Sequence, residues 1–130
     1  MNKRLWILMF LLILAAGCGQ ADKEKDEKNM YKQISMTEAK NIMSTESNYI
    51  LLDVRTQEEY NSGHIPGALC IPNEEILSTQ PDELPDKEQL ILVYCRSGNR
   101  SKQASEKLAA MGYTNIVEFG GIIEWDGEIE

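Results

Sequence analysis

The hydrophobic positions of the chain fall into three zones. An unbroken apolar run covers residues 5–16, whereas residues 19–29 are polar and of mixed charge. From residue 30 onward, short apolar runs alternate with segments whose apolar residues recur at helical spacing. About a hundred residues are enough for one domain of ordinary size. The pattern therefore predicts a single folded domain over residues 30–130.

The third zone predicts strands that alternate with helices. Helical segments begin near residues 35, 56, 73, 100 and 120, and the strands cover residues 31–34, 49–54, 69–71, 90–94 and 116–119. Ser35 and Thr56 each stand three residues before a glutamate, as in a capping box. Alternation of this kind predicts an α/β fold, with a mainly parallel five-stranded sheet and helices on both faces. Ligands bind beyond the carboxyl ends of such strands, where Arg55 and Cys95 fall.

The first zone has the features of an export signal. Lys3 and Arg4 precede the apolar run, which would span about 18 Å as a helix against roughly 30 Å of bilayer hydrocarbon. Because the run is too short for a permanent transmembrane helix, a cleaved signal is the better interpretation. Residues 14–18 resemble the lipobox of bacterial lipoproteins, with Ala15 where leucine is commoner.

The lipobox resemblance implies cleavage before Cys18 and attachment of lipid to its thiol. We expect a signal peptide at residues 1–17, the lipidated cysteine and a polar tether at residues 18–29, and the folded domain beyond. A diacylated cysteine would hold the protein stably on the extracytoplasmic face of the cell membrane. The alternative is an ordinary secretory signal in which the cysteine is incidental.

The charge balance excludes one class of partner. Without the leader, the chain keeps 11 of its 13 basic residues and all 21 acidic ones, a net charge of −10. Nucleic acids repel such a field, so we expect no nucleic-acid partner. We expect a monomer that needs no cofactor and no metal.

A cluster of polar and basic residues interrupts this acidic background directly after the most hydrophobic strand. Cys95 ends the strand, and a helix follows, so the loop directs unpaired backbone amides and a positive helix dipole toward its centre. Gly98 permits the positive φ that folds amides inward. These features lower a thiol pKa or attract an anion, and they predict a reactive nucleophile at Cys95. The substrate-binding loop is expected to contain Arg96, Ser97, Gly98, Asn99, Arg100 and Ser101.

Cys70 stands between Leu69 and Ile71, which is the setting of a small buried filler. A disulfide between Cys70 and Cys95 is conceivable outside the cytoplasm, and the sequence neither supports nor excludes it.

Several motifs resemble those of the rhodanese family of sulfurtransferases, in the order in which that family carries them. They lie at residues 52–55, 58–60, 63–68, 95–101 and 120–125, and together they cover about residues 31–127. The resemblance implies a three-layer rhodanese-like fold. It also implies that the Cys95 thiolate takes the outer sulfur of a donor such as thiosulfate as a persulfide and passes it to cyanide or a thiol. The loop amides would hold the persulfide, and the arginines would hold the anionic donor.

Other residues receive structural interpretations. Asp53 and Arg55 are interpreted as an ion pair that supports the strand end. The resemblance places His64, the only histidine, in a structural turn rather than as a general base. Tyr60 and Trp125 are expected to pack in the core.

Two alternative functions stay open. Related phosphatases place five residues between cysteine and arginine, whereas four separate Cys95 from Arg100, so the loop suits sulfur better than phosphate. Arsenate reductases share the fold, but such chemistry would need a resolving thiol, for which only Cys70 is available. The other alternative is a noncatalytic persulfide carrier or binding module.

Overall fold

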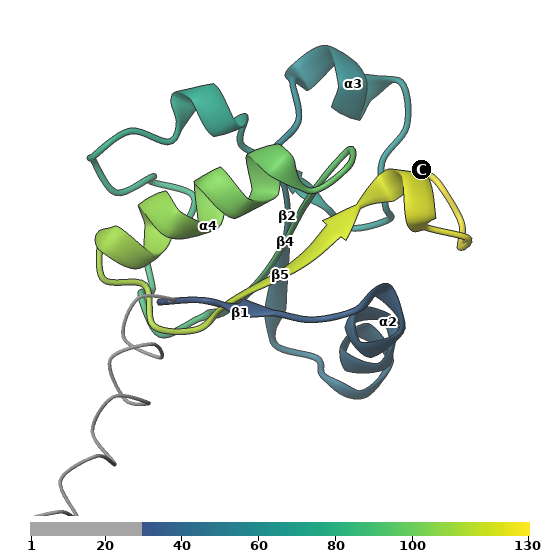
Figure 1. The fold of residues 1–130 in the computed structure, drawn as a ribbon, viewed down its shortest axis with the longest axis horizontal. Coiled ribbons are helices and arrows are strands. Elements are labelled where there is room, and N and C mark those ends of the chain that lie inside the picture. The colour runs from purple at the N-terminus through teal and green to yellow at the C-terminus, as the bar shows by residue number, and fades with distance from the viewer. Residues whose placement is uncertain (1–29) are drawn as a thin grey trace, which may run out of the picture.

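A computed structural model describes residues 30–130, and it contains one five-stranded sheet (Figure 1). Every pairing in the sheet is parallel, with the strand order β1-β5-β4-β2-β3. The predicted α/β fold class with a five-stranded parallel sheet is confirmed. The strands are β1 (Lys32–Gln33), β2 (Tyr49–Asp53), β3 (Leu69–Cys70), β4 (Leu90–Cys95) and β5 (Ile116–Gly121).

Helices cover both faces of the sheet. α4 (Asn99–Ala110) lies on one face and α2 (Met36–Thr45) on the other, while the short α3 (Gln57–Asn61) stands near the carboxyl end of β2 (Figure 1). The 3₁₀ segments η2 (Asn73–Glu75) and η3 (Ile122–Glu124) complete the domain. Thr56 and Glu59 form the full predicted capping box, whereas Ser35 caps α2 only through the bond from the Glu38 amide.

The last predicted helical segment begins later than expected. Gly120 and Gly121 belong to β5, and only residues 122–124 turn as a 3₁₀ helix. The physical reason is an irregularity between Val93 and Cys95, which shifts the register so that Gly121 lies opposite Cys95. Pairing with β4 therefore extends β5 to the edge of the nucleophile loop.

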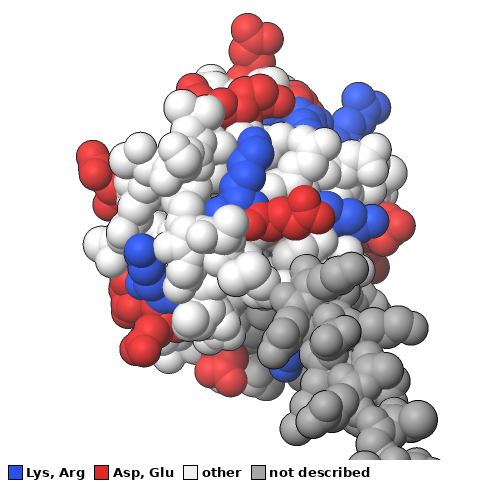
Figure 2. Space-filling view, turned by 60° about the vertical axis from the view of Figure 1, so that its left-hand side comes forward, with Lys and Arg blue, Asp and Glu red and all other residues white. Residues whose placement is uncertain are grey.

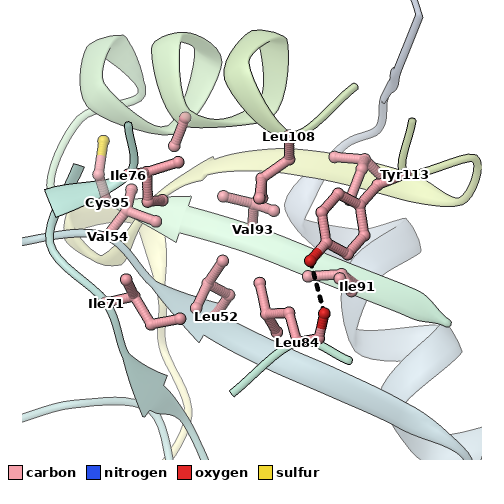
Figure 3. Close-up of a cluster of buried hydrophobic side chains, with 12 residues drawn as sticks. Leu52, Val54, Ile71, Ile76, Leu84, Ile91, Val93, Cys95, Leu108 and Tyr113 are labelled. Atoms are coloured by element: carbon pink, nitrogen blue, oxygen red, sulfur yellow. Dashed lines mark hydrogen bonds between the residues drawn. The ribbon is translucent and has the colours of Figure 1, made fainter. Parts of the chain in front are cut away.

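Side chains alternate between two hydrophobic layers. Ile91, Val93 and Cys95 of β4 face α4, whereas Leu92 and Tyr94 face α2. Figure 3 shows the α4-side cluster, with Cys95 at one end and its sulfur on the side of the helix. The nucleophile loop therefore starts from a strand that is almost entirely buried in the sheet.

The surface carries mixed charge. On the face shown in Figure 2, acidic and basic side chains of the described residues are interspersed, without a continuous basic patch. No helix within residues 30–130 has the length and apolar character needed to span a membrane. The predicted signal peptide, Cys18 and tether lie outside the described residues.

Candidate active site

The thiol of Cys95 lies where β4 meets α4. The side chain is 1% exposed, and its sulfur accepts a hydrogen bond of 3.0 Å from the Gly98 amide. Gly98 is the N-cap residue of α4 and has φ of 114°, a left-handed conformation that favours glycine. Because glycine has no side chain to cap the helix, the first amides of α4 stay available to a negatively charged group. The loop thus has the geometry of an anion cradle around sulfur.

The pKa of the Cys95 thiol is set by two opposing effects. Burial raises it, because a thiolate is poorly solvated in the protein interior. Hydrogen bonding with the Ser101 hydroxyl and hydrogen bonds from the amides of Ser101, Gly98 and Ser97 lower it, and together they outweigh burial. The net pKa lies below the ordinary value for cysteine, which increases the thiolate fraction near neutral pH.

The carboxyl end of β5 closes one side of the loop. Ile123 donates its amide to the Arg96 carbonyl at 3.3 Å. A Cβ at Gly121 would lie 1.9 Å from the same carbonyl oxygen and 2.6 Å from the Ser97 nitrogen. A glycine at this position therefore permits direct backbone contact between β5 and the loop.

The two arginines of the loop are in different environments. Arg96 is exposed at the mouth of the loop, with Ser97 and Asn99. Arg100 is half-buried and forms a two-pronged ion pair with Glu59 of α3, at 2.6 Å for Nη1 to Oε1 and 3.1 Å for Nη2 to Oε2. The Arg100 hydrogen bonds lower the pKa of Glu59 to about 2. Arg100 thus connects the start of α4 to α3, and Arg96 is the loop cation that faces solvent.

Asp53 and Arg55 form a buried ion pair that supports the strand end. Arg55 Nη2 lies 2.7 Å from Asp53 Oδ2, and the same carboxylate oxygen accepts a 2.7 Å bond from the Tyr94 hydroxyl. Arg55 also donates to the Gly63 carbonyl at 2.7 Å. Since Tyr94 faces α2 and Cys95 faces α4, this network lies on the opposite side of the sheet from the thiol.

His64 and Cys70 also lie away from the nucleophile. The His64 ring stacks on Tyr60 at 3.8 Å, and its Nδ1 lies 3.0 Å from the Tyr60 carbonyl oxygen, as expected for a structural turn. Cys70 and Tyr94 flank Asp53 in the sheet, so β2 separates β3 from β4. Two strand spacings amount to about 9.5 Å, beyond the roughly 7 Å limit for a disulfide. Burial raises the pKa of Cys70 to about 11, a further contrast with Cys95.

Glu118 is a polar residue beside the nucleophile to which the sequence pattern assigned no role. Glu118 is 2% exposed in β5, and its carboxylate accepts a 2.7 Å bond from the Ser101 hydroxyl. Its only signal in the sequence is a single carboxylate inside a hydrophobic strand, and the strand predicted at residues 116–119 assigned it no role.

Known proteins share this architecture and sequence. The family model of the rhodanese-like domain matches residues 35–128. Thiosulfate sulfurtransferase PspE of Escherichia coli is 41% identical over 71 residues, which cover 55% of this chain and 68% of that protein. The adenylyltransferase and sulfurtransferase uba4 of Ogataea parapolymorpha is 34% identical over 89% of this chain, which spans only 28% of that longer protein.

The crystal structure of a rhodanese-like domain protein from Staphylococcus aureus superposes with a TM-score of 0.64 at 35% identity. The alignment covers 76% of this chain and 96% of that one, so the likeness extends over nearly the whole solved domain. Fold, sequence and the loop around a buried thiol agree, and the chain belongs to the family of rhodanese-like sulfurtransferases.

Proposed function

We propose that Cys95 is the catalytic nucleophile and that it carries a sulfane sulfur from a small anionic donor, such as thiosulfate, to cyanide or a thiol. The observation that supports this most directly is the 3.0 Å hydrogen bond from the Gly98 amide to the sulfur, at the start of a helix. The same arrangement that stabilises a thiolate suits the persulfide anion that replaces it. The whole reaction uses side chains and backbone of the loop, without a cofactor.

The first half-reaction forms the persulfide. The thiolate attacks the outer sulfur of thiosulfate, a bond forms between the two sulfurs, and the bond from that sulfur to the sulfonate breaks. The electron pair of the broken bond leaves with sulfite, and the negative charge of Cys95 moves to the new terminal sulfur. Amides at the start of α4 stabilise this charge, which develops beside them rather than in bulk water.

The second half-reaction restores the enzyme. Cyanide or a thiolate attacks the terminal sulfur, the bond between the sulfurs breaks, and Cys95 recovers its electron pair as thiolate. Because donor and acceptor react in separate steps, the proposal predicts ping-pong kinetics. Arg96 is the exposed cation that attracts the anionic donor, while Arg100 fixes the position of the loop through Glu59.

Cyanolysis of thiosulfate tests the proposal directly. Wild-type protein is expected to produce thiocyanate, and Cys95→Ser is expected to lose this activity. Cys70→Ser is the matched control, because Cys70 is partly buried on the other side of β2 and should leave turnover unchanged. Activity that persists in Cys95→Ser would refute the proposed nucleophile.

Intact mass separates an enzyme from a noncatalytic carrier. After incubation with thiosulfate, one added sulfur of about 32 mass units is expected on Cys95, and cyanide should remove it. A carrier would show the same added mass but negligible turnover with any donor. Rapid cyanide-dependent turnover therefore identifies the enzyme.

We further propose that lipid on Cys18 holds the domain at the extracytoplasmic face of the cell membrane. The support is the short apolar leader with small residues before Cys18. Wild-type protein should sediment with membranes, whereas Cys18→Ala should not carry lipid. A Cys18→Ala protein that keeps the lipid mass of the wild type would contradict this assignment.

A further inference from the structure

A buried carboxylate lies behind the nucleophile, in a layer where the other buried strand residues are apolar. Glu118 of β5 points toward α4, as Ile116 does two residues earlier. It is 2% exposed, and no lysine or arginine within residues 30–130 forms an ion pair with it. A buried charge without a cation is costly, so its environment must supply other stabilisation.

Two hydrogen bonds converge on one oxygen of this carboxylate. Glu118 Oε1 accepts the Gly120 amide at 2.8 Å and the Ser101 hydroxyl at 2.7 Å. The second distance is that of a well-formed bond from a hydroxyl to a carboxyl oxygen. Both bonds end on the same oxygen, so the Ser101 proton is directed toward Glu118.

The Ser101 hydroxyl also lies 3.4 Å from the sulfur of Cys95. It has a single proton, for which the Gly98 carbonyl at 2.9 Å competes as well. While that proton points to Glu118, the oxygen can only accept a hydrogen bond from the thiol. Ser101 can donate its hydroxyl proton to a thiolate only when Glu118 does not accept that proton. This is the case when the Glu118 carboxyl group is protonated.

We propose that Glu118 receives the proton of the Cys95 thiol through the Ser101 hydroxyl. The thiol proton moves to Ser101 Oγ while the Ser101 proton moves to Glu118 Oε1. The products are a thiolate, an unchanged hydroxyl and a neutral carboxylic acid, and the charge of the three groups stays at one negative unit. Ser101 now donates to the thiolate, as an activated nucleophile requires.

This inference rests on the proposed function of Cys95 and adds a route for its proton. The negative charge moves from one buried group to another, and on the sulfur the Gly98 amide receives it. The carboxylic acid keeps the proton while the persulfide is present, so two negative charges do not meet in the interior. Glu118 does not contact the sulfur. It acts on Cys95 only through the Ser101 hydroxyl and is therefore a positioning residue.

Within residues 30–130, few other titratable groups lie around Glu118. Cys95 lies on the adjacent β4, Tyr31 precedes β1, and Glu106 lies on α4. The pKa of Tyr31 is raised mainly by burial and further by the charges of Glu106 and Glu118. Arg100 on α4 is bound to Glu59. Lys32 of β1 and Lys102 of α4 are exposed, and α2, with Glu38 and Lys40, lies across the sheet.

The test is the pH profile of Cys95 alkylation by iodoacetamide, followed by intact mass in Cys70→Ser protein. Two groups that share a proton titrate in two steps. We expect the alkylation rate to rise in two steps as the pH increases. The step at lower pH reflects thiolate that forms while Glu118 holds the proton. Glu118→Gln cannot take a proton and should show one rise, with the rate on the former lower plateau reduced by about tenfold or more.

Matched variants separate a proton route from structural support. Ser101→Ala should also lose the lower rise, whereas Ser101→Thr keeps a hydroxyl and should retain it. Glu106→Gln removes an exposed charge on α4 and should leave both rises in place. A single rise in the parent protein, or two rises that persist in folded Glu118→Gln, overturns the proposal.

Alkylation requires no sulfur donor, so this result is independent of cyanolysis. If the parent protein lacks thiocyanate production but shows two rises that depend on Glu118, the proposed function fails and the proton route stands. If thiocyanate is produced and only one rise is seen, the reverse holds. Should Glu118→Gln not fold, the parent profile and the Ser101 pair still decide.

Discussion

Replacement of Gly121 by alanine tests whether backbone contact with β5 holds the nucleophile loop in position. The glycine has φ of −141°, which any residue adopts, so alanine introduces no backbone strain there. Its Cβ would lie 1.9 Å from the Arg96 carbonyl oxygen, whereas ordinary contacts begin near 3.4 Å. The loop must therefore move by roughly 1.5 Å, and the obstacle is backbone rather than a flexible side chain.

A shift of this size breaks the support of the thiolate. The Gly98 amide lies 3.0 Å from the sulfur, and a further 1.5 Å or so would take it out of hydrogen-bond range. A hydrogen bond to a charged group contributes about 1.5–3 kcal/mol, which corresponds to a fall of roughly 10- to 150-fold in rate. We expect kcat for cyanolysis of thiosulfate to fall by that factor in Gly121→Ala.

The control for this experiment is Gly67→Ala. Gly67 has φ of +84°, and a Cβ added to it would meet open space, so alanine there should cost about 1 kcal/mol of stability without changing kcat. Circular dichroism and thermal unfolding establish that both variants fold. A folded Gly121→Ala protein with the kcat of the wild type would refute the reasoning that β5 positions the loop.

Three further predictions concern the ion pair of Glu59 with Arg100, the buried Tyr94 hydroxyl and the exposed Arg96. Arg100 hydrogen bonding depresses the pKa of Glu59 from 4.5 to about 2, so the pair stabilises the fold above pH 4.5 and the contribution is lost as pH falls toward 2. Glu59→Gln should lower the free energy of unfolding by about 1 kcal/mol at pH 7 in urea titrations. The difference between wild type and variant should narrow at pH 3, and an equal difference at both pH values would contradict a stabilising ion pair. Tyr94→Phe removes one hydrogen bond from Asp53 Oδ2, which keeps its bonds from Arg55, and leaves the Ile65 amide without its partner. The substitution should cost about 1–3 kcal/mol, measured as a lower Tm, and an unchanged Tm would contradict this role of the hydroxyl. Arg96→Ala should raise KM for thiosulfate several-fold at low salt with little change in kcat, and a KM that is insensitive to both the substitution and salt would exclude Arg96 from donor attraction.

Much of the fold is local in origin and could be predicted from the sequence. The alternation of apolar runs with helical periodicity requires only neighbours within a few residues, and the capping box at Thr56 spans three. The loop after Cys95 is equally local, because a strand that ends where a helix begins brings the amides and the thiol together within four residues. Strand-helix alternation likewise determined the parallel sheet, since parallel strands need crossover connections.

Contacts between distant residues required the tertiary structure. Arg100 is 41 residues from Glu59, and only the sheet order places α4 beside α3, which leaves Arg96 as the exposed cation of the loop. The distance across β2 that separates Cys70 from Cys95 also follows from strand order rather than from spacing in the chain. No local pattern carries this information, because each pairing depends on which strands become neighbours.

Cys95 and its loop could therefore be predicted from the sequence alone, but the surroundings of the thiol could not. Glu118 reaches Ser101 because β5 pairs with β4 in one register, with an irregularity before Cys95 that places Gly121 opposite it. A change of one residue in that register would turn the carboxylate toward α2. Local residue type and spacing determined that a nucleophile is present. Strand pairing decided which groups contact its loop and which groups lie within hydrogen-bond reach of the thiol and of Ser101.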